Sequence, residues 1–529
     1  TDAQLDINSN QSIACAKDAK ITTSDSLFHR GLSLIGVTDV LIDGLNIQGP
    51  SVGDGFDIAI YSEDESNITI QNCTIRGVGK VSASTEKGHG LLFTSNSIIE
   101  PVIGVSGNFN ITVVNNAITD IKGHGYLRGD AVYFRCVKGG SIHGNTLGNT
   151  RRMTVALTDH VYDVKITDNE IFDCHLAGID LEPNDYSGDS VVISGNTIRN
   201  FGIKPEGQTG VQYHGIDVRS MDYVSISNNV IIAENDQAEN CINVINRADK
   251  CVISDNTLIC NGHASNGMHL YAGSGLDTVT ITGNIIEEFT EYGISSSSNG
   301  NDNILIDGNN IHSTRLDAVK GIFVGAGQCH ISDNIVKVDA LEAIQDYPYG
   351  IQVSQSKRAT IIGNQVRIGT GTGESTTGGI LVYISGVGMA GSVFNVSDNF
   401  VERVSTEPTA GRGIFLWGRT DAKGVYTAKG NQFRNVQYEL AHSEHMERVG
   451  VTEVSSVDAL SKVNRHNYSV WKNNETVEVL GYHSAGDGGG GTFFWDADST
   501  DAPDGGTIIA PFNSTGDGRW KRVYSGAVN

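Results

Sequence analysis

Short runs in which apolar and polar residues alternate recur along most of the chain. In residues 179–182, which read Ile-Asp-Leu-Glu, two aliphatic side chains alternate with two carboxyls. A β-strand with this pattern buries the aliphatic residues and presents both carboxyls outward. Similar runs occupy residues 215–219 and 267–271. We therefore predict strands whose outer face collects polar and aromatic side chains, as the floor of a binding groove does.

A phrase centred on asparagine repeats through the same part of the chain. It consists of an alternating apolar strand, often a Gly, Asp or Asn, then the central Asn, and then an apolar residue one or two positions later. The copies centre on Asn72, Asn116, Asn145, Asn169, Asn196, Asn229, Asn256, Asn284, Asn309, Asn334, Asn364, Asn399 and Asn431. Repeats at such spacings indicate a solenoid, a propeller or an array.

The content of each repeat favours a parallel β-helix. Each period contains two or three short β runs and almost no helical periodicity, which excludes helical solenoids. A propeller blade needs four antiparallel strands and about 40 residues, whereas most periods here are shorter. A β-helix turn of about 22 to 30 residues fits this spacing. The repeated Asn suits a bend because it tolerates the left-handed region and because its amide can hydrogen-bond along a stack of like residues. We predict an all-β fold, a right-handed single-stranded parallel β-helix (solenoid), over residues 1–440.

The C-terminal part differs in composition. Residues 441–476 contain a polar connector, in which residues 455–463 have the sequence of a short capped helix. Residues 477–529 are predicted to form a small β module rich in Gly and aromatic residues, with turn freedom supplied by the four glycines at 488–491. The aromatic residues expected in its core are Phe493, Phe494, Trp495 and Trp520.

Charge and cysteine content exclude several function classes. The chain has 37 basic and 61 acidic residues, a formal net charge of −24, which argues against nucleic acid and anionic membranes as partners. An acidic polysaccharide remains possible if arginines line the groove. Eight cysteines without CxxC spacing indicate buried thiols and no metal or redox site. No apolar run approaches 18 residues, so we expect no membrane insertion. The chain begins with Thr1, so we expect it to be processed or partial.

Aligning the turns on the asparagine phrase brings the candidate site residues onto one face. Successive turns of a parallel sheet lie about 4.8 Å apart, and positions i and i+2 about 6.5 to 7 Å apart. Asp180 and Asp217 are then expected to stack at roughly 5 Å, with Glu182 diagonally at roughly 8 Å from Asp217. The outward positions, turn by turn, are Tyr133 and Arg135; Asp180 and Glu182; Asp217 and Arg219; Asn243; His269 and Tyr271.

The Gly- and Asn-punctuated repeat resembles the pectate-lyase-like superfamily, whose members mostly cleave or isomerise polysaccharides. Residues 477–496, 504–507 and 518–523 look like a module common in bacteriophage tailspike and capsule-depolymerase proteins. In that family the module usually precedes the β-helix, whereas here it follows. The resemblance implies a polysaccharide substrate, a homotrimer, and a location in the virion tail or outside the cell.

The cluster suits an endo-glycoside hydrolase acting on a bacterial surface or extracellular polysaccharide. One carboxyl must hold a proton for the leaving oxygen and another must stay ionised, and stacked carboxyls push one pKa upward. The diagonal pair predicts inversion, with Glu182 as acid and Asp217 as base, whereas the stacked pair Asp180 and Asp217 favours retention. No metal or cofactor is expected. The predicted substrate-binding residues are Tyr133, Arg135, Arg219, Asn243, His269 and Tyr271.

Two alternatives remain open. A polysaccharide lyase would take its base from Tyr213, His214, His269 or Tyr271, and the three carboxyls would bind calcium to neutralise a uronate. A non-catalytic adhesin or tail fibre would use the groove only to hold glycan. Product analysis separates them, because hydrolysis makes new reducing ends, elimination makes an unsaturated product, and an adhesin makes neither.

Overall fold

The computed structural model describes most of the chain. The described residues are 5–15, 20–22, 30–50, 56–79, 88–95, 101, 106–123, 129–183, 188–203, 213–246, 248–272, 278–298, 303–315, 317–325, 327–339, 349–369, 378–404, 412–419, 421–436, 438–443, 445–448, 452–465, 473–511 and 516–524.

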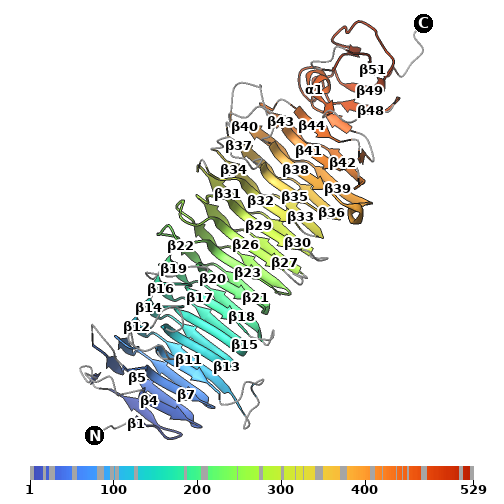
Figure 1. Ribbon diagram of the computed structural model, residues 1–529. Helices are drawn as coiled ribbons and strands as arrows, with labels where there is room; N and C mark the ends of the chain where they lie inside the picture. The colour runs from blue at the N-terminus through green and yellow to red at the C-terminus, as the bar shows by residue number, and fades with distance from the viewer. Residues whose placement is uncertain are drawn as a thin grey trace. The chain divides into compact units, whose positions relative to one another are not determined.

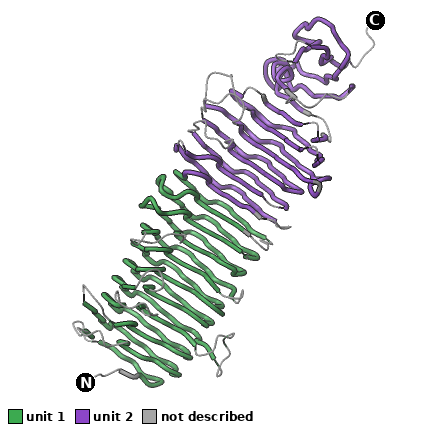
Figure 2. Tube along the Cα trace, viewed as in Figure 1, with its two compact units in different colours: residues 1–289 green, residues 290–529 purple. Residues whose placement is uncertain are grey.

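The protein is an all-β right-handed parallel β-helix of about 13 turns, with 2% helix and a small C-terminal sheet. The predicted fold class is therefore confirmed. Figure 2 shows its two compact units, unit 1 (residues 1–289) and unit 2 (residues 290–529). Among the described residues, no helix has the length and apolar character needed to span a membrane.

In unit 1 each turn adds strands to three parallel columns (Figure 1). Column 1 comprises β1 (Leu5–Asp6), β4 (Arg30–Ile35), β7 (Ile58–Glu63), β10 (His89–Thr94), the first half of β13 (Asp130–His143) and of β15 (Val155–Thr167), β17 (Ile179–Glu182), β20 (His214–Arg219), β23 (Asn240–Ile245) and β26 (Asn266–Ala272). Column 2 comprises β2 (Ser12–Ala14), β5 (Thr38–Asp43), β8 (Ser66–Gln71), β11 (Asn108–Val114), the second halves of β13 and β15, β18 (Gly188–Ser194), β21 (Asp222–Ser227), β24 (Cys251–Ser254) and β27 (Thr278–Thr282). Column 3 comprises β3 (Lys20–Thr22), β6 (Asn46–Gln48), β9 (Thr74–Arg76), β12 (Ala117–Ile121), β14 (Thr146–Thr150), β16 (Glu170–Cys174), β19 (Thr197–Phe201), β22 (Val230–Ile232), β25 (Thr257–Ile259) and β28 (Ile285–Glu287).

Rows of aliphatic side chains hold these turns together. Ile179 lies opposite Ile216, and Ile216 opposite Ile242, in the parallel ladder of column 1. All three are fully buried, and each such side chain stabilises the fold by about 1.5–3 kcal/mol. Gly178 allows the backbone before β17 to pass close to Ile198 of column 3. A Cβ at position 178 would lie 2.6 Å from Cγ2 of Ile198. The strand alternation then directs Asp180 outward from the aliphatic core.

A row of buried asparagines runs along one bend of unit 1. The amide of each donates to the side-chain oxygen of the next at 2.9–3.0 Å, so the predicted stacking of amides is present. Asn72 does not belong to it, because Cys73 stands in that position and donates its backbone N–H to Asn116. The members are Asn116, Asn145, Asn169, Asn196, Asn229, Asn256 and Asn284.

The left-handed residue of each bend is the one before the row asparagine. Asn115, Gly144 and Asp168 all have φ between 55° and 62° and precede Asn116, Asn145 and Asn169 respectively. Gly, Asn and Asp tolerate this region best. The expectation that the repeated Asn itself adopts the left-handed conformation is therefore wrong. The residue before it adopts that conformation, and the repeated Asn makes the side-chain hydrogen bonds of the row.

Unit 2 continues the same construction. Its column 1 comprises β29 (Tyr292–Ser298), β32 (Lys320–Gly325), β35 (Tyr349–Ser354), β38 (Gly378–Ile384), β41 (Arg412–Gly418), β44 (Tyr438–His442) and β47 (Asn464–Arg465). Column 2 comprises β30 (Asn303–Asp307), β33 (Gln328–Ser332), β36 (Arg358–Ile362), β39 (Ser392–Ser397), β42 (Gly424–Lys429) and β45 (Met446–Arg448), and a 3-10 turn, η2 (Val387–Met389), precedes β39. Column 3 comprises β31 (Asn310–Ser313), β34 (Ile335–Val338), β37 (Gln365–Ile368), β40 (Phe400–Arg403) and β43 (Gln432–Arg434). A second asparagine row consists of Asn309, Asn334, Asn364, Asn399 and Asn431.

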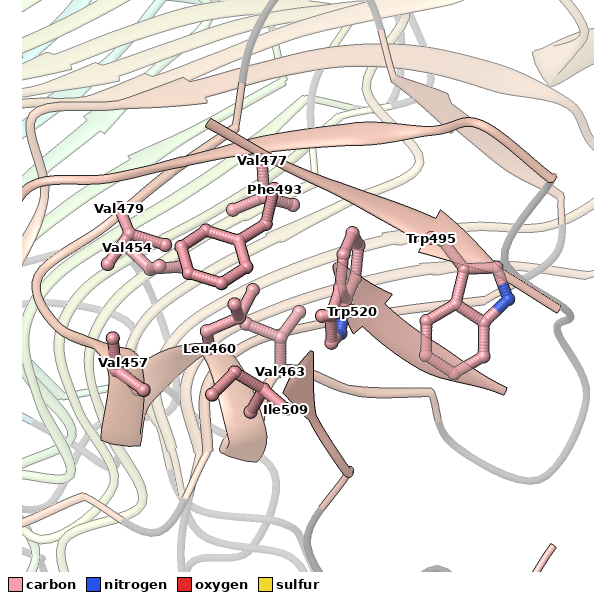
Figure 3. Packing of buried hydrophobic residues seen from close by; sticks show 11 residues of the cluster. Val454, Val457, Leu460, Val463, Val477, Val479, Phe493, Trp495, Ile509 and Trp520 are labelled. Carbon is pink, nitrogen blue, oxygen red and sulfur yellow. The ribbon is translucent and has the colours of Figure 1, made fainter. Parts of the chain in front are cut away.

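The C-terminal sheet has the order β46 (Thr452–Val454), β48 (Thr476–Val479), β49 (Gly491–Asp496), β51 (Arg519–Arg522) and β50 (Ile508–Ile509). Helix α1 (Val457–Lys462), capped by the Ser456 hydroxyl, lies in the predicted helical segment. Figure 3 shows Leu460 of this helix in one core with Phe493 and Trp520. The strand β46 and the helix thus lie in the segment that we had assigned to a connector, yet they pack with this sheet.

The aromatic core of the C-terminal sheet is smaller than predicted. Trp495 and Trp520 pack edge to face with ring centroids 5.3 Å apart, and both are buried together with Phe493. Phe494 is only partly buried and does not join this core. It alternates with its two buried neighbours along β49 and therefore faces the other side of the sheet.

Candidate functional site

The three predicted carboxyls lie together on column 1 of unit 1. Asp180 on β17 is directly opposite Asp217 on β20, as the alignment of the turns on the asparagine phrase predicted. Adjacent strands lie about 4.8 Å apart, so the two carboxyls face each other across one turn. Glu182 follows Asp180 by two residues on the same strand and therefore has the same outward orientation.

Asp180 is fully buried, and neither of its carboxyl oxygens has a hydrogen-bond partner. Burial, and then the negative charges of Asp217 and Glu182, raise the pKa of Asp180 well above its usual value. Ala156, directly opposite Asp180 on the preceding turn, belongs to an apolar cluster that also contains Met153. Asp180 is therefore a carboxylic acid that keeps its proton where an exposed aspartate loses it.

Asp217 is equally buried, but its two oxygens are bonded. Arg219 Nε donates to Oδ2 at 2.7 Å, and Asn243 Nδ2 donates to Oδ1 at 2.8 Å. A terminal nitrogen of Arg219 also lies 3.6 Å from Glu182, whose side chain is 40% exposed. Of the three carboxyls, Glu182 is thus the one that solvent reaches, and Arg219 joins it to Asp217.

The later turns extend this network towards His269. Asn243 accepts a hydrogen bond from His269 Nδ1 at 3.0 Å, so the neutral imidazole leaves Nε2 as its acceptor atom. Burial lowers the pKa of His269, which favours that neutral form. Tyr271 is 46% exposed and its ring is parallel to that of His269, with centroids 6.5 Å apart. His269 lies two turns beyond Asp217 on column 1, and the buried Asn243 lies on the turn between them.

Tyr133 and Arg135 lie one turn further from the carboxyls than the alignment of the turns on the asparagine phrase suggested. A complete turn intervenes, because Tyr133 is opposite Ala156, and Ala156 in turn is opposite Asp180. Arg135 donates to Asp159 at 2.9 Å, and the Tyr133 hydroxyl accepts from Thr158 at 2.8 Å. The structure therefore does not bring Tyr133 and Arg135 into contact with the carboxyl cluster.

A second buried ionic group, which the sequence patterns did not indicate, involves the first residues of β10 and β13. Arg152 lies 3.2 Å from Asp130, and His89 Nδ1 lies 3.1 Å from the same oxygen. Burial alone would raise the pKa of Asp130, but Arg152 and His89 outweigh it and lower that pKa. Arg152 also opposes the rise in the pKa of Asp180. Asn145 and Asn169 are 24 residues apart, which is one full turn. This spacing is the sequence signal that places Arg152 and Ala156 on a turn of their own.

No arrangement of three or more His, Cys, Asp or Glu side chains suited to a metal ion occurs within the described ranges. The three carboxyls are not arranged as such a group, since Asp217 is already bound on both oxygens.

Two parts of the chain match known protein families. Residues 58–231 match the family described as "Right handed beta helix region", which includes β17 and β20. Residues 453–525 match the "Phage tail protein small four-stranded beta-sheet domain". The predicted likeness to phage tail proteins is confirmed. The match begins at residue 453 and so includes α1, which agrees with the packing of that helix against the C-terminal sheet.

Three solved structures of phage proteins are similar to this chain at low identity. The tailspike of Pseudomonas phage phi297 is 13% identical over 60% of this chain and 54% of its own, with a TM-score of 0.38. The N-terminal fragment of bacteriophage Phi29 gene product 12 is 13% identical over 89% and 90%, with a TM-score of 0.39. Tailspike protein 3 of bacteriophage CBA120 is 10% identical over 91% and 64%, with a TM-score of 0.41. These likenesses carry no argument about function, and no curated protein matches the sequence.

Proposed function

We propose that unit 1 hydrolyses glycosidic bonds within a bacterial surface or extracellular polysaccharide. The observation that carries the proposal is the pair Asp180 and Glu182, one carboxyl with a strongly raised pKa and one exposed carboxyl at alternate positions of β17. Positions i and i+2 of a strand are about 6.6 Å apart. That spacing lies within the range of about 6.5–9.5 Å that leaves room for a water molecule in inverting glycosidases.

The proposed roles follow from these environments. Asp180 gives its proton to the leaving oxygen as the glycosidic C–O bond breaks, and Glu182 takes a proton from the water that attacks the anomeric carbon. Asp217 acts as a positioning residue, since it holds Arg219 and its charge raises the pKa of Asp180. These roles replace the earlier assignment of Glu182 as acid and Asp217 as base. Because Asp180 is buried, the glycan must displace part of the neighbouring apolar cluster before proton transfer.

The rings of His269 and Tyr271 are the proposed binding surface for a pyranose ring. Their parallel arrangement and the exposure of Tyr271 support this role, because aromatic faces bind the apolar faces of amphipathic ligands. Arg219 is the proposed contact for a substrate carboxylate or hydroxyl, although its Nε is already bound to Asp217.

The test compares Asp180→Asn, Glu182→Gln and Asp217→Asn on a panel of purified capsular polysaccharides and O-antigens. We expect new reducing ends with the wild-type protein and a loss of at least about 10²-fold in turnover for Asp180→Asn and Glu182→Gln, with unchanged melting. The matched control is Asp163→Asn, because Asp163 is exposed in the same unit. Full activity of all three variants would refute the site. Products with a double bond would identify a lyase, for which neutral His269 is the candidate base.

Non-catalytic glycan binding is the second candidate. It is favoured by one observation, the burial of both Asp180 and Asp217, which leaves Glu182 as the accessible carboxyl of the three. In that case no polysaccharide of the panel yields new ends, while Tyr271→Ala still weakens retention of the glycan on the protein.

We further propose that the chain acts in the virion tail as a homotrimer. The match of residues 453–525 to a phage tail protein domain supports the location. Sedimentation equilibrium at micromolar protein should give three times the chain mass of 56.4 kDa. A monomer under these conditions would contradict the trimer.

A further inference from the structure

Unit 2 carries an exposed cluster of aromatic rings on its own column 1. Trp417 on β41 lies directly opposite Tyr383 on β38, with ring centroids 5.2 Å apart. Phe415, two residues earlier on β41, stacks on Trp417 at 5.9 Å with an angle of 18° between the rings. Trp417 is 40% exposed, whereas Phe415 is buried below it. We call Tyr383, Phe415 and Trp417 the aromatic corner.

The buried ring of the aromatic corner, Phe415, packs against several neighbouring side chains. Arg412 lies 4.1 Å from the ring centre of Phe415, which is a close cation–π contact. Phe415 also packs in a buried cluster with Tyr349 and Leu381 outside the aliphatic core. Trp417 is therefore held in a fixed orientation although it is partly exposed. A ring held in this way loses little conformational entropy when a ligand stacks on it.

A polar rim adjoins the rings. Ser354 precedes Tyr383 in the same register row, and it accepts a hydrogen bond from Gln352 at 2.9 Å. Gln355 directly follows Ser354, and it bonds to Ser385 on the next turn through both its amide nitrogen and its oxygen. Amide and hydroxyl groups beside an exposed ring suit a ligand that is apolar on one face and rich in hydroxyls at its edge.

The charge of this surface differs from that of the chain as a whole. The outward described positions of β35, β38 and β41 carry no carboxylate, although the chain has a net charge of −24. Arg412 is the charged residue at these positions. The aromatic corner therefore does not repel an acidic sugar.

The size of the apolar surface favours a small ring over a protein partner. Among the described residues of β35, β38 and β41, Trp417 is the large apolar side chain that is strongly exposed. A stable protein interface buries about 800 Å² on each partner, far more than one indole ring offers. A single pyranose ring matches the indole face in size.

We propose that the aromatic corner is a second, non-catalytic glycan-binding site, which stacks a hexopyranose ring of a polysaccharide on Trp417. The site lies within unit 2 and does not depend on hydrolysis in unit 1. It holds the polysaccharide by ring stacking on Trp417 and Tyr383, with the Gln352 and Ser354 rim facing the sugar hydroxyls.

The experiment measures binding of the full chain to an array of purified capsular polysaccharides and O-antigens. Every protein carries Glu182→Gln, so that cleavage does not consume the probe. We expect Trp417→Ala to weaken binding about 5- to 10-fold with unchanged melting, and Trp417→Phe to restore most of it. The matched control is Tyr223→Ala, since Tyr223 is a 50% exposed ring on β21 outside the aromatic corner, and we expect it to bind like the wild type.

Three outcomes would overturn the proposal. The first is that the Glu182→Gln protein binds no polysaccharide of the array, and the second is that Trp417→Ala binds as tightly as its parent. The third is that Trp417→Ala changes the sedimenting mass, which would make the ring part of an interface between copies of the chain. Absence of new reducing ends with the wild-type protein, with Trp417-dependent binding intact, would refute the hydrolase alone.

Discussion

Glu65 allows a quantitative prediction of how stability depends on pH. Its carboxyl is buried, and it accepts hydrogen bonds from the Ser62 hydroxyl and from the backbone N–H of Glu63 at 3.1 Å. Burial raises the pKa of Glu65 from 4.5 to about 8 despite these bonds. The folded state therefore binds this proton more tightly than the unfolded state. The resulting stabilisation is fully present below pH 4.5 and is lost as the pH rises towards 8.

The perturbation that isolates this effect is Glu65→Gln. A glutamine amide can donate to Ser62 and accept from Glu63, so both hydrogen bonds survive without a titrating proton. At pH 7 the wild-type protein has lost roughly 3 kcal/mol relative to pH 4, at about 1.4 kcal/mol for each pH unit above 4.5. For a unit of 289 residues this corresponds to roughly 5 °C in melting temperature.

The assay is thermal melting by circular dichroism at pH 4 and pH 7. We expect Glu65→Gln to melt close to the wild type at pH 4 and roughly 5 °C higher at pH 7. Glu234→Gln is the control, because Glu234 is exposed in the same unit and should not change the difference between the two pH values. A Glu65→Gln protein that follows the wild type at both pH values would refute the reasoning, since the carboxyl would then titrate normally.

Two further predictions concern the asparagine row and the C-terminal sheet. Asn229→Ala should lower the free energy of unfolding, measured by chemical denaturation, by roughly 3–6 kcal/mol. The reason is that the Asn196 N–H, the Ile193 carbonyl and the Asn256 side-chain oxygen each lose a buried partner. The control Ser227→Ala on the same turn should lower it by under about 1 kcal/mol, and equal losses would contradict the argument. Asp487 accepts four backbone N–H bonds, which lower its pKa, so its stabilisation is present above pH 4 and is lost as the pH falls below it. Asp487→Ala should therefore lower the melting temperature of the C-terminal sheet more at pH 7 than at pH 2, as followed by tryptophan fluorescence, and equal losses at both pH values would contradict this account.

The repeat and its alternation were sufficient to predict the fold. A buried aliphatic at every second position and an Asn at each bend are local signals, and each recurs often enough to exclude other repeat architectures. The alternation also determined that Asp180 and Glu182 point the same way, because the side-chain period of a strand does not depend on its neighbours.

Only the structure shows which residue of each bend adopts the left-handed conformation and which one joins the asparagine row. Both Asn115 and Asn116 are asparagines, and their sequence does not say which adopts the left-handed conformation and which joins the row. The backbone shows that Asn115 turns and Asn116 is buried with its amide bonded to Asn145. Cys73 occupies the same position in the preceding turn, and its backbone N–H donates to the side-chain oxygen of Asn116.

The candidate site also has features that the sequence predicts and features that depend on the packing of the turns. The sequence determined the outward carboxyls, since alternation is a property of one strand. Which turn lies beside which depends on how many residues each loop contains, and the ladder of column 1 places Ala156 between Tyr133 and Asp180. Burial of Asp180 likewise depends on side chains from other turns, and its raised pKa follows from that burial and from Asp217 on the next strand. Proton affinity is therefore a property of the packed site, because desolvation and nearby charges come from residues distant in the chain.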